Sequence, residues 1–239
     1  MMTVVKQYSG TLMKYHLPLL AIVISTLATS SFAQSKFEGL YGQVAVGYES
    51  VNPSSTNTPI RVSNPSDTIP LSTSISNTSG GTGNIALGYT VSLIKDFTLG
   101  IGAEYYPIDS SKGNYSATAL GRTATGTYQK QAAYNIYIAP GMNVGTDGLA
   151  YFKVGYTGAS VKSSQGSVSD TENISGYSLG LGYKQFFSGN WYGFGEANYF
   201  KYGNSVDNQS ATVGKSTLSV STTLGTYAYN VLVGVGYKF

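Results

Sequence analysis

The end of the chain reads Tyr227-Ala-Tyr-Asn-Val-Leu-Val-Gly-Val-Gly-Tyr-Lys-Phe239. Every second residue in this stretch is Tyr, Val or Phe, and the residues between them are mostly small or polar. Side chains that alternate in this way are typical of a β-strand, because successive side chains of a strand point to opposite faces. The stretch therefore predicts a strand with one bulky apolar face that continues to the last residue.

The same alternation recurs along the chain and predicts an all-β fold of eight strands. The other seven runs lie at 40–48, 85–93, 97–105, 132–138, 150–156, 177–183 and 191–202. The last of these is aromatic on both faces, so its orientation stays open. Elsewhere the polar face carries Asn84, Gln131 and Asn135 and is rich in glycine. Glycine weakens strands, and a narrow barrel with a crowded inner wall accounts for its use there.

Alternation alone does not say which face meets solvent, since a soluble lipocalin-like barrel has the same period. The connections decide between the two. Short links at 94–96, 143–148 and 187–190 alternate with long ones at 50–82, 107–128, 158–175 and 203–225. The segment 50–82 is mostly Ser, Thr, Asn, Pro and Gly, which suits water. Short turns on one rim and long loops on the other are typical of transmembrane barrels.

Composition excludes several classes of protein. Charged residues make up 10% of the 239 residues, against about 25% in soluble domains. The net charge of +3 gives no support for a nucleic-acid partner. The chain has no cysteine, so disulfides do not stabilise it.

The first residues predict a secretory signal peptide over 1–33. Lys6 and Lys14 precede an apolar stretch at 17–28, and the expected cleavage lies between Ala33 and Gln34. A membrane anchor is the alternative, but a spanning helix needs about 20 apolar residues. Cleavage leaves residues 34–239 as one barrel domain and removes the chain's single histidine, His16.

Three segments carry a resemblance to a known family: Phe97-Thr-Leu-Gly-Ile-Gly-Ala-Glu-Tyr-Tyr106, Tyr151-Phe-Lys-Val-Gly-Tyr156 and Val233-Gly-Val-Gly-Tyr-Lys-Phe239. With them the chain resembles the OmpA-like and opacity-type small outer-membrane β-barrels. The resemblance implies an eight-stranded antiparallel up-and-down transmembrane barrel with long extracellular loops and short periplasmic turns. It implies location in the cell outer membrane among lipid and lipopolysaccharide, assembly by the barrel-assembly machinery, and a monomer. The peptidoglycan-binding domain of longer members is not expected.

The resemblance also implies roles for individual residues. Tyr237 and Phe239 are expected to form the assembly signal in the last strand, or else Phe239 simply finishes a hydrophobic strand. Charged side chains that fill the lumen are expected at Glu104, Lys153, Lys184 and Glu196. A Glu104–Lys153 ion pair and separately solvated charges are both open.

The sequence offers no catalytic, metal or cofactor site. Gly176-Tyr-Ser-Leu-Gly180 matches a serine-nucleophile pattern, but that chemistry needs a strand-to-helix turn and a histidine. We therefore expect a non-enzymatic protein that needs no cofactor. The first functional hypothesis is a structural and surface-display barrel whose loops mediate adhesion or contact host and cell surfaces. The alternative is a narrow, porin-like passive channel for small solutes.

Overall fold

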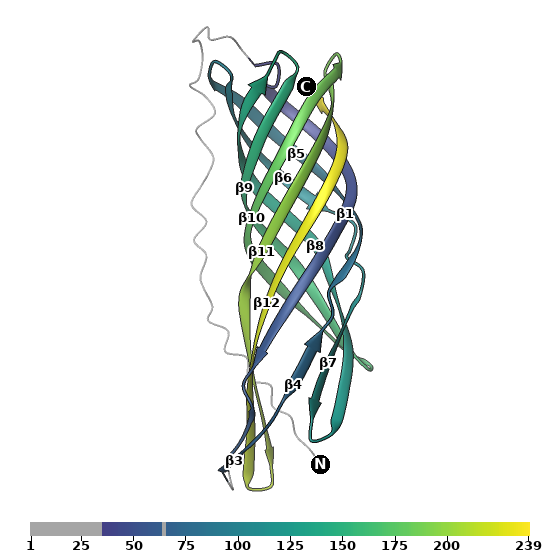
Figure 1. Ribbon diagram of the computed structural model, residues 1–239, viewed down its shortest axis with the longest axis vertical. Helices are drawn as coiled ribbons and strands as arrows, with labels where there is room; N and C mark the ends of the chain where they lie inside the picture. Colours follow the sequence, from purple (N-terminus) through teal and green to yellow (C-terminus); the bar gives the residue numbers. More distant parts are fainter. Residues whose placement is uncertain (1–34, 64–65) are drawn as a thin grey trace.

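The computed structural model describes residues 35–63 and 66–239, and the predicted signal peptide with its Ala33–Gln34 cleavage site lies outside them. Eight long antiparallel strands form a closed ring (Figure 1). They are β1 (Gly39–Asn57), β5 (Thr78–Ile94), β6 (Phe97–Tyr106), β8 (Arg122–Val144), β9 (Gly148–Gln165), β10 (Val168–Ser188), β11 (Trp191–Val213) and β12 (Ser216–Lys238). The ring closes between the first and last strands, which pair from Tyr41↔Lys238 to Asn57↔Thr222. The predicted up-and-down order is confirmed.

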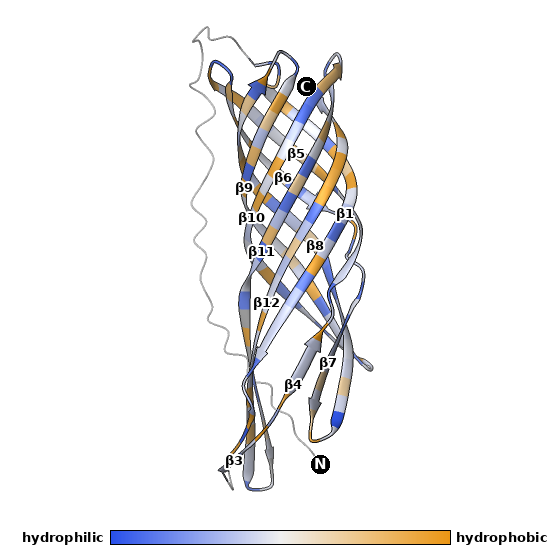
Figure 2. Ribbon diagram, viewed as in Figure 1, coloured by the Kyte–Doolittle hydropathy of each residue, from blue (hydrophilic) through white to orange (hydrophobic). Residues whose placement is uncertain are grey.

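The bulky apolar faces point outward. On β12, Val231 and Val233 are exposed, whereas Asn230 and Leu232, which alternate with them, are buried inside the ring. In Figure 2, hydrophobic residues alternate with hydrophilic ones along the strands in the upper part of the barrel. A wall of exposed Val, Leu, Ile and Tyr is unfavourable in water and favourable against lipid. Across residues 35–63 and 66–239, no helix is long and apolar enough to span a membrane.

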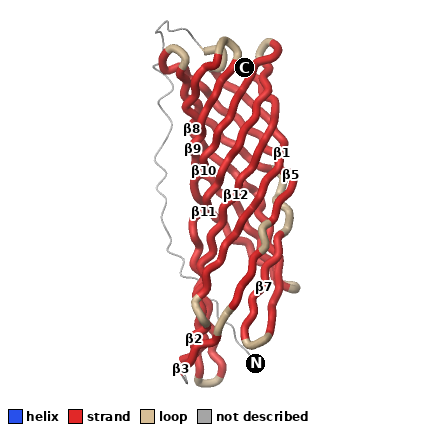
Figure 3. The backbone as a smooth tube through the Cα atoms, viewed as in Figure 1, coloured by secondary structure: helices blue, strands red, loops and turns tan. Residues whose placement is uncertain are grey.

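The two rims differ as the connection lengths predict. One rim, here called the turn rim, has tight links at 95–96, 145–147 and 189–190. The other, the hairpin rim, differs from the expected long loops, because most of its residues are strand (Figure 3). Several main strands continue into it, and it adds β2 (Ile60–Ser63), β3 (Ser66–Ile69), β4 (Ser72–Ile75) and β7 (Gly113–Ala119). Ser and Thr are frequent in these segments and are compatible with strands. Pairing as hairpins satisfies the backbone N–H and C=O groups of these residues.

The structure corrects the predicted inward face of one strand, β8, and gives the orientation of β11, which the sequence left open. A register shift between Gln131 and Tyr134 on β8, with Ala132 at φ 48°, inverts the inward face at this point. Lys130 is therefore buried and Gln131 is not, which corrects the assignment of Gln131 to the polar inner face. The bulge places one extra residue on β8. On β11, whose orientation was open, Tyr192 and Glu196 point inward.

Inward tyrosines explain many of the strand glycines. Each of four buried tyrosine rings lies across the glycine directly opposite it on the neighbouring strand. The pairs are Tyr41 with Gly88, Tyr137 with Gly102, Tyr151 with Gly182 and Tyr192 with Gly236. Each ring occupies the space that a side chain at the opposite position would fill. The inner wall is therefore crowded, as the glycine content predicts.

We expect Gly102→Val to destabilise the barrel by about 1–3 kcal/mol, the usual cost of overpacking. A Cβ atom at Gly102 would lie 2.6 Å from the Tyr137 hydroxyl. Urea unfolding in detergent measures the change. Gly195→Val is the matched control, because a Cβ atom at Gly195 meets nothing within 4 Å. Equal stability of the two variants would contradict the role of the Tyr137 ring.

Candidate functional site

Three charged side chains meet within the lumen and are here called the central ion cluster. Lys153 of β9 places Nζ 2.5 Å from Glu104 Oε1 of β6 and 2.8 Å from Glu196 Oε1 of β11. All three side chains are at most 1% exposed. The structure thus contains the Glu104–Lys153 ion pair considered from the sequence, and it adds Glu196 to the same ammonium group.

Neutral donors complete the hydrogen bonding of the two carboxylates. Glu104 Oε2 accepts from Asn135 Nδ2 at 3.1 Å and from the Tyr106 hydroxyl at 3.2 Å. Glu196 accepts from the Tyr151 hydroxyl at 2.8 Å and from Asn198 Nδ2 at 2.7 Å. Most buried charges in proteins are paired and hydrogen-bonded in this way. The central ion cluster therefore connects β6, β9 and β11 across the lumen, and both of its carboxylates are hydrogen-bonded.

Lys184 of β10 is held by aromatic rings. Its Nζ lies 4.0 Å from the ring centroid of Tyr41, 5.1 Å from that of Tyr192 and 5.2 Å from that of Tyr151. An ammonium group over the face of a ring is attracted by the ring quadrupole. Sequence reasoning placed Lys184 in the lumen but gave no sign of this cage, because the three tyrosines come from three other strands.

A second ion pair lies nearer the hairpin rim. Lys130 Nζ of β8 is 2.5 Å from Glu49 Oε1 of β1, and both side chains are at most 6% exposed. Sequence reasoning missed this outer ion pair. Glu49 continues the inward face of β1 and could have been found by extending the alternation past Gly47. Lys130 could not, because the bulge at Ala132 shifts its face.

The residues before β1 close the turn rim. The Phe37 side chain is buried, with its ring 4.5 Å from that of Phe186 and 6.2 Å from that of Tyr192. We call these three rings the aromatic cap. Lys36 Nζ lies 2.6 Å from Asp147 Oδ1 in the β8–β9 turn. The hydrogen bond from Lys36 holds the pKa of the Asp147 carboxyl below its usual value.

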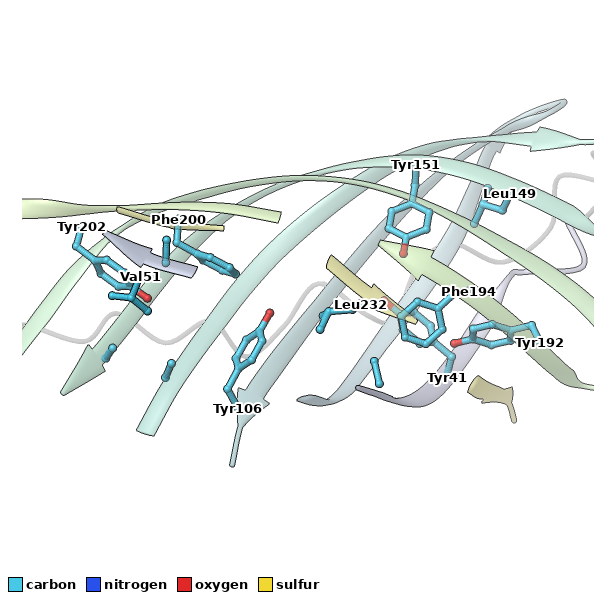
Figure 4. Close-up of a cluster of buried hydrophobic side chains, with 14 of the residues drawn as sticks. Tyr41, Val51, Tyr106, Leu149, Tyr151, Tyr192, Phe194, Phe200, Tyr202 and Leu232 are labelled. Atoms are coloured by element: carbon cyan, nitrogen blue, oxygen red, sulfur yellow. The ribbon is translucent and has the colours of Figure 1, made fainter. Parts of the chain in front are cut away.

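Large side chains occupy the rest of the lumen. Figure 4 shows two groups of rings along it, with Tyr41, Tyr151 and Tyr192 toward one end and Tyr106 and Phe200 toward the other. A void of about 10 Å³ beside Lys184 and Glu196 has about the size of one water molecule. The interior is thus packed with side chains around Lys184 and the central ion cluster.

The predicted assembly-signal residues lie at the turn rim on the outer wall. The Tyr237 ring is 5.1 Å from that of Trp191, and the Phe239 ring is 5.3 Å from that of Tyr237. The backbone N–H of Phe239 donates to the carbonyl of Leu40 at 2.9 Å. These contacts place the end of the chain within an aromatic cluster at the seam between β12 and its neighbours.

The serine of the nucleophile-like pattern lies within strand β10. The Ser178 hydroxyl is buried in the lumen and donates to Asn135 Oδ1 at 2.7 Å. This is a structural bond in a strand rather than an exposed nucleophile at a strand-to-helix turn. In the described part of the chain, no group of three or more His, Cys, Asp or Glu side chains is placed to hold a metal ion.

Comparison with known proteins agrees with the architecture. OprG from Pseudomonas aeruginosa is 10% identical with a TM-score of 0.54, and the match covers 86% of this chain and 99% of OprG. This likeness shows a shared fold. Two further matches have lower TM-scores. The outer membrane protease OmpT from Escherichia coli is 11% identical with a TM-score of 0.47, and the match covers 89% of this chain and 99% of OmpT. The attachment invasion locus protein Ail from Yersinia pestis is 15% identical with a TM-score of 0.42, and the match covers 84% of this chain and 99% of Ail.

The family assignment rests on the sequence itself. No curated protein matches the chain. The family model described as "Outer membrane protein beta-barrel domain" matches residues 19–239, nearly the whole chain. The resemblance to small outer-membrane barrels and the outer-membrane location are therefore confirmed. The chain belongs to the outer membrane protein β-barrel domain family.

Proposed function

We propose that this protein is a closed, non-catalytic barrel that displays its extracellular hairpins for contact with surfaces outside the cell. The observation that carries the proposal is the filled lumen. The aromatic cap, the central ion cluster and the outer ion pair place side chains in it at three points along the strands, which supports a closed barrel. A barrel of eight strands has an interior just wide enough to be filled by side chains.

The hairpin rim supports display. Transmembrane strands need about 9–11 residues to cross the bilayer, whereas β8, β11 and β12 each have 23. Their excess length projects beyond the membrane as paired strands. Paired strands hold exposed side chains in a fixed arrangement, so a partner would meet an ordered surface.

The proposal extends to the partners expected from the resemblance. The exposed apolar wall suits membrane lipid and lipopolysaccharide, and the aromatic end of β12 suits recognition by the barrel-assembly machinery. We propose that the barrel is a monomer, since its ring is closed by its own first and last strands. We also propose that the protein is not an enzyme, because the buried Ser178 hydroxyl makes a structural hydrogen bond to Asn135 and the lumen is filled by side chains.

We expect the purified protein to give no steady conductance in planar lipid bilayers, because side chains occupy the lumen around the ion clusters. We also expect cells that display it to adhere to host-cell monolayers more than cells without it. A variant with residues 205–223 of the β11–β12 hairpin replaced by a short turn serves as the matched control for adhesion.

Either readout can overturn the proposal. Steady ohmic conductance of the wild-type protein would favour the narrow-channel alternative. Equal adhesion by cells with the full barrel, the shortened barrel and no barrel would remove the display role. Heat-modifiable migration on a detergent gel checks that every variant tested is folded.

A further inference from the structure

The hairpin rim carries a wide, open pocket of about 490 Å³. It lies over strands β4, β7 and β8 and the end of β9. We call it the hairpin pocket. Seven of its ten lining residues are Ser, Thr or Asn.

Strand register arranges the polar side chains in two rows. Ser74, Ser116 and Thr125 lie opposite one another across β4, β7 and β8. The next row contains Asn114, Thr127 and Ser164, paired across β7, β8 and β9. Ser76 joins this row, since its N–H donates to the Asn114 carbonyl at 2.9 Å.

Both rows point away from the lumen. Residues two apart on a strand share a face, so the two rows lie on the same face of the sheet. Ile75, which lies between Ser74 and Ser76, packs against the buried cluster inside the barrel. The serine, threonine and asparagine side chains therefore form an ordered grid of hydroxyl and amide groups on the outer face.

The chemistry of the grid narrows the class of ligand. Each hydroxyl can donate and accept, and the amide of Asn114 does both. No charged side chain lines the pocket. Lys162, opposite Gln129, lies one row further along β9 and is not part of the lining. Anionic ligands are usually held by Arg or Lys, and acyl chains need an apolar wall, so neither fits this surface.

We infer that the hairpin pocket binds an uncharged saccharide, whose many hydroxyl groups match the paired donors and acceptors of the grid. This inference rests on the proposed display function and names the ligand class of that surface. It assigns the recognition to β4, β7, β8 and β9 and not to the longer β11–β12 hairpin.

The test uses the full-length protein in lipid nanodiscs on an array of N-acetyllactosamine and maltose oligosaccharides, with sialylated and sulfated forms of the same cores. Binding to uncharged glycans is expected. The double variant Ser116→Ala/Thr125→Val removes two hydroxyls from one row with little change in shape, and we expect at least tenfold weaker binding. Ser210→Ala/Thr217→Val, in the exposed part of the β11–β12 hairpin, is the matched control and should bind like the wild type.

The outcomes separate this inference from the proposed function. Absence of binding to uncharged glycans, preference for the sialylated or sulfated forms, or equal binding by the Ser116/Thr125 variant would each overturn the saccharide site. If that variant still supports cell adhesion at the wild-type level while the shortened hairpin does not, display stands and the saccharide site fails. Display fails separately if cells with the wild-type barrel adhere no better than cells without it.

Discussion

Replacing Lys153 with methionine is expected to lower the free energy of unfolding by about 3–5 kcal/mol, the usual cost of breaking a buried ion pair from one side. The lysine is shared by Glu104 and Glu196, and their buried carboxylates would be left without a cation. Two like charges in a site of low dielectric repel each other strongly. The hydrogen bonds from Asn135 and Tyr151 would remain but carry no compensating charge.

Urea unfolding in detergent micelles, followed by the fluorescence of Trp191, measures the change. The triple variant Glu104→Gln/Lys153→Met/Glu196→Gln removes all the charges of the central ion cluster and should regain most of the lost stability. Lys215→Met, in the exposed β11–β12 turn, should change stability by less than about 0.5 kcal/mol. If the single and triple variants were equally unstable, packing and not uncompensated charge would be the cause.

The architecture of the barrel follows from the sequence because lipid and a packed lumen make opposite demands on the two faces of each strand. A strand that slips by one residue exposes its polar face to lipid. The alternation of apolar and polar residues is therefore regular wherever a strand crosses the membrane. Val231 and Val233 on β12 carry this signal without interruption. The charged lumen residues could be predicted for the same reason, since Glu104 follows Gly100 and Gly102 on an inward face and Lys153 precedes Gly155 on another.

Other features of the structure depend on a bulge or on contacts between distant residues, which the alternation of apolar and polar residues does not predict. Lys130 faces inward only because a bulge at Ala132 inserts one residue, and nothing in the local sequence marks that bulge. Phe37 precedes the first strand, and its burial depends on Phe186 and Tyr192 far along the chain. Much of the hairpin rim is exposed to water, so its Ser and Thr residues can form strands without showing a regular hydrophobic pattern.

Deleting Phe239 is expected to abolish nearly all outer-membrane assembly, leaving the protein in the periplasm or degraded. The resemblance to small outer-membrane barrels implies that the end of the last strand, with Tyr237, is the signal for assembly. The structure sharpens this test, because the Phe239 side chain is 66% exposed on the outer wall and its ring contact is with Tyr237. Its removal should therefore cost the folded barrel little packing, and failed assembly would reflect lost recognition.

Trp191→Ala is the matched control. It removes a larger ring from the same aromatic cluster, 5.1 Å from Tyr237, but leaves the end of the chain intact. Outer-membrane fractionation with heat-modifiable gel migration should find this variant assembled and the deletion absent. Normal insertion without Phe239 would show that the residue only completes the strand. Loss of both variants would place the requirement in rim packing, since recognition of the terminus alone cannot depend on Trp191.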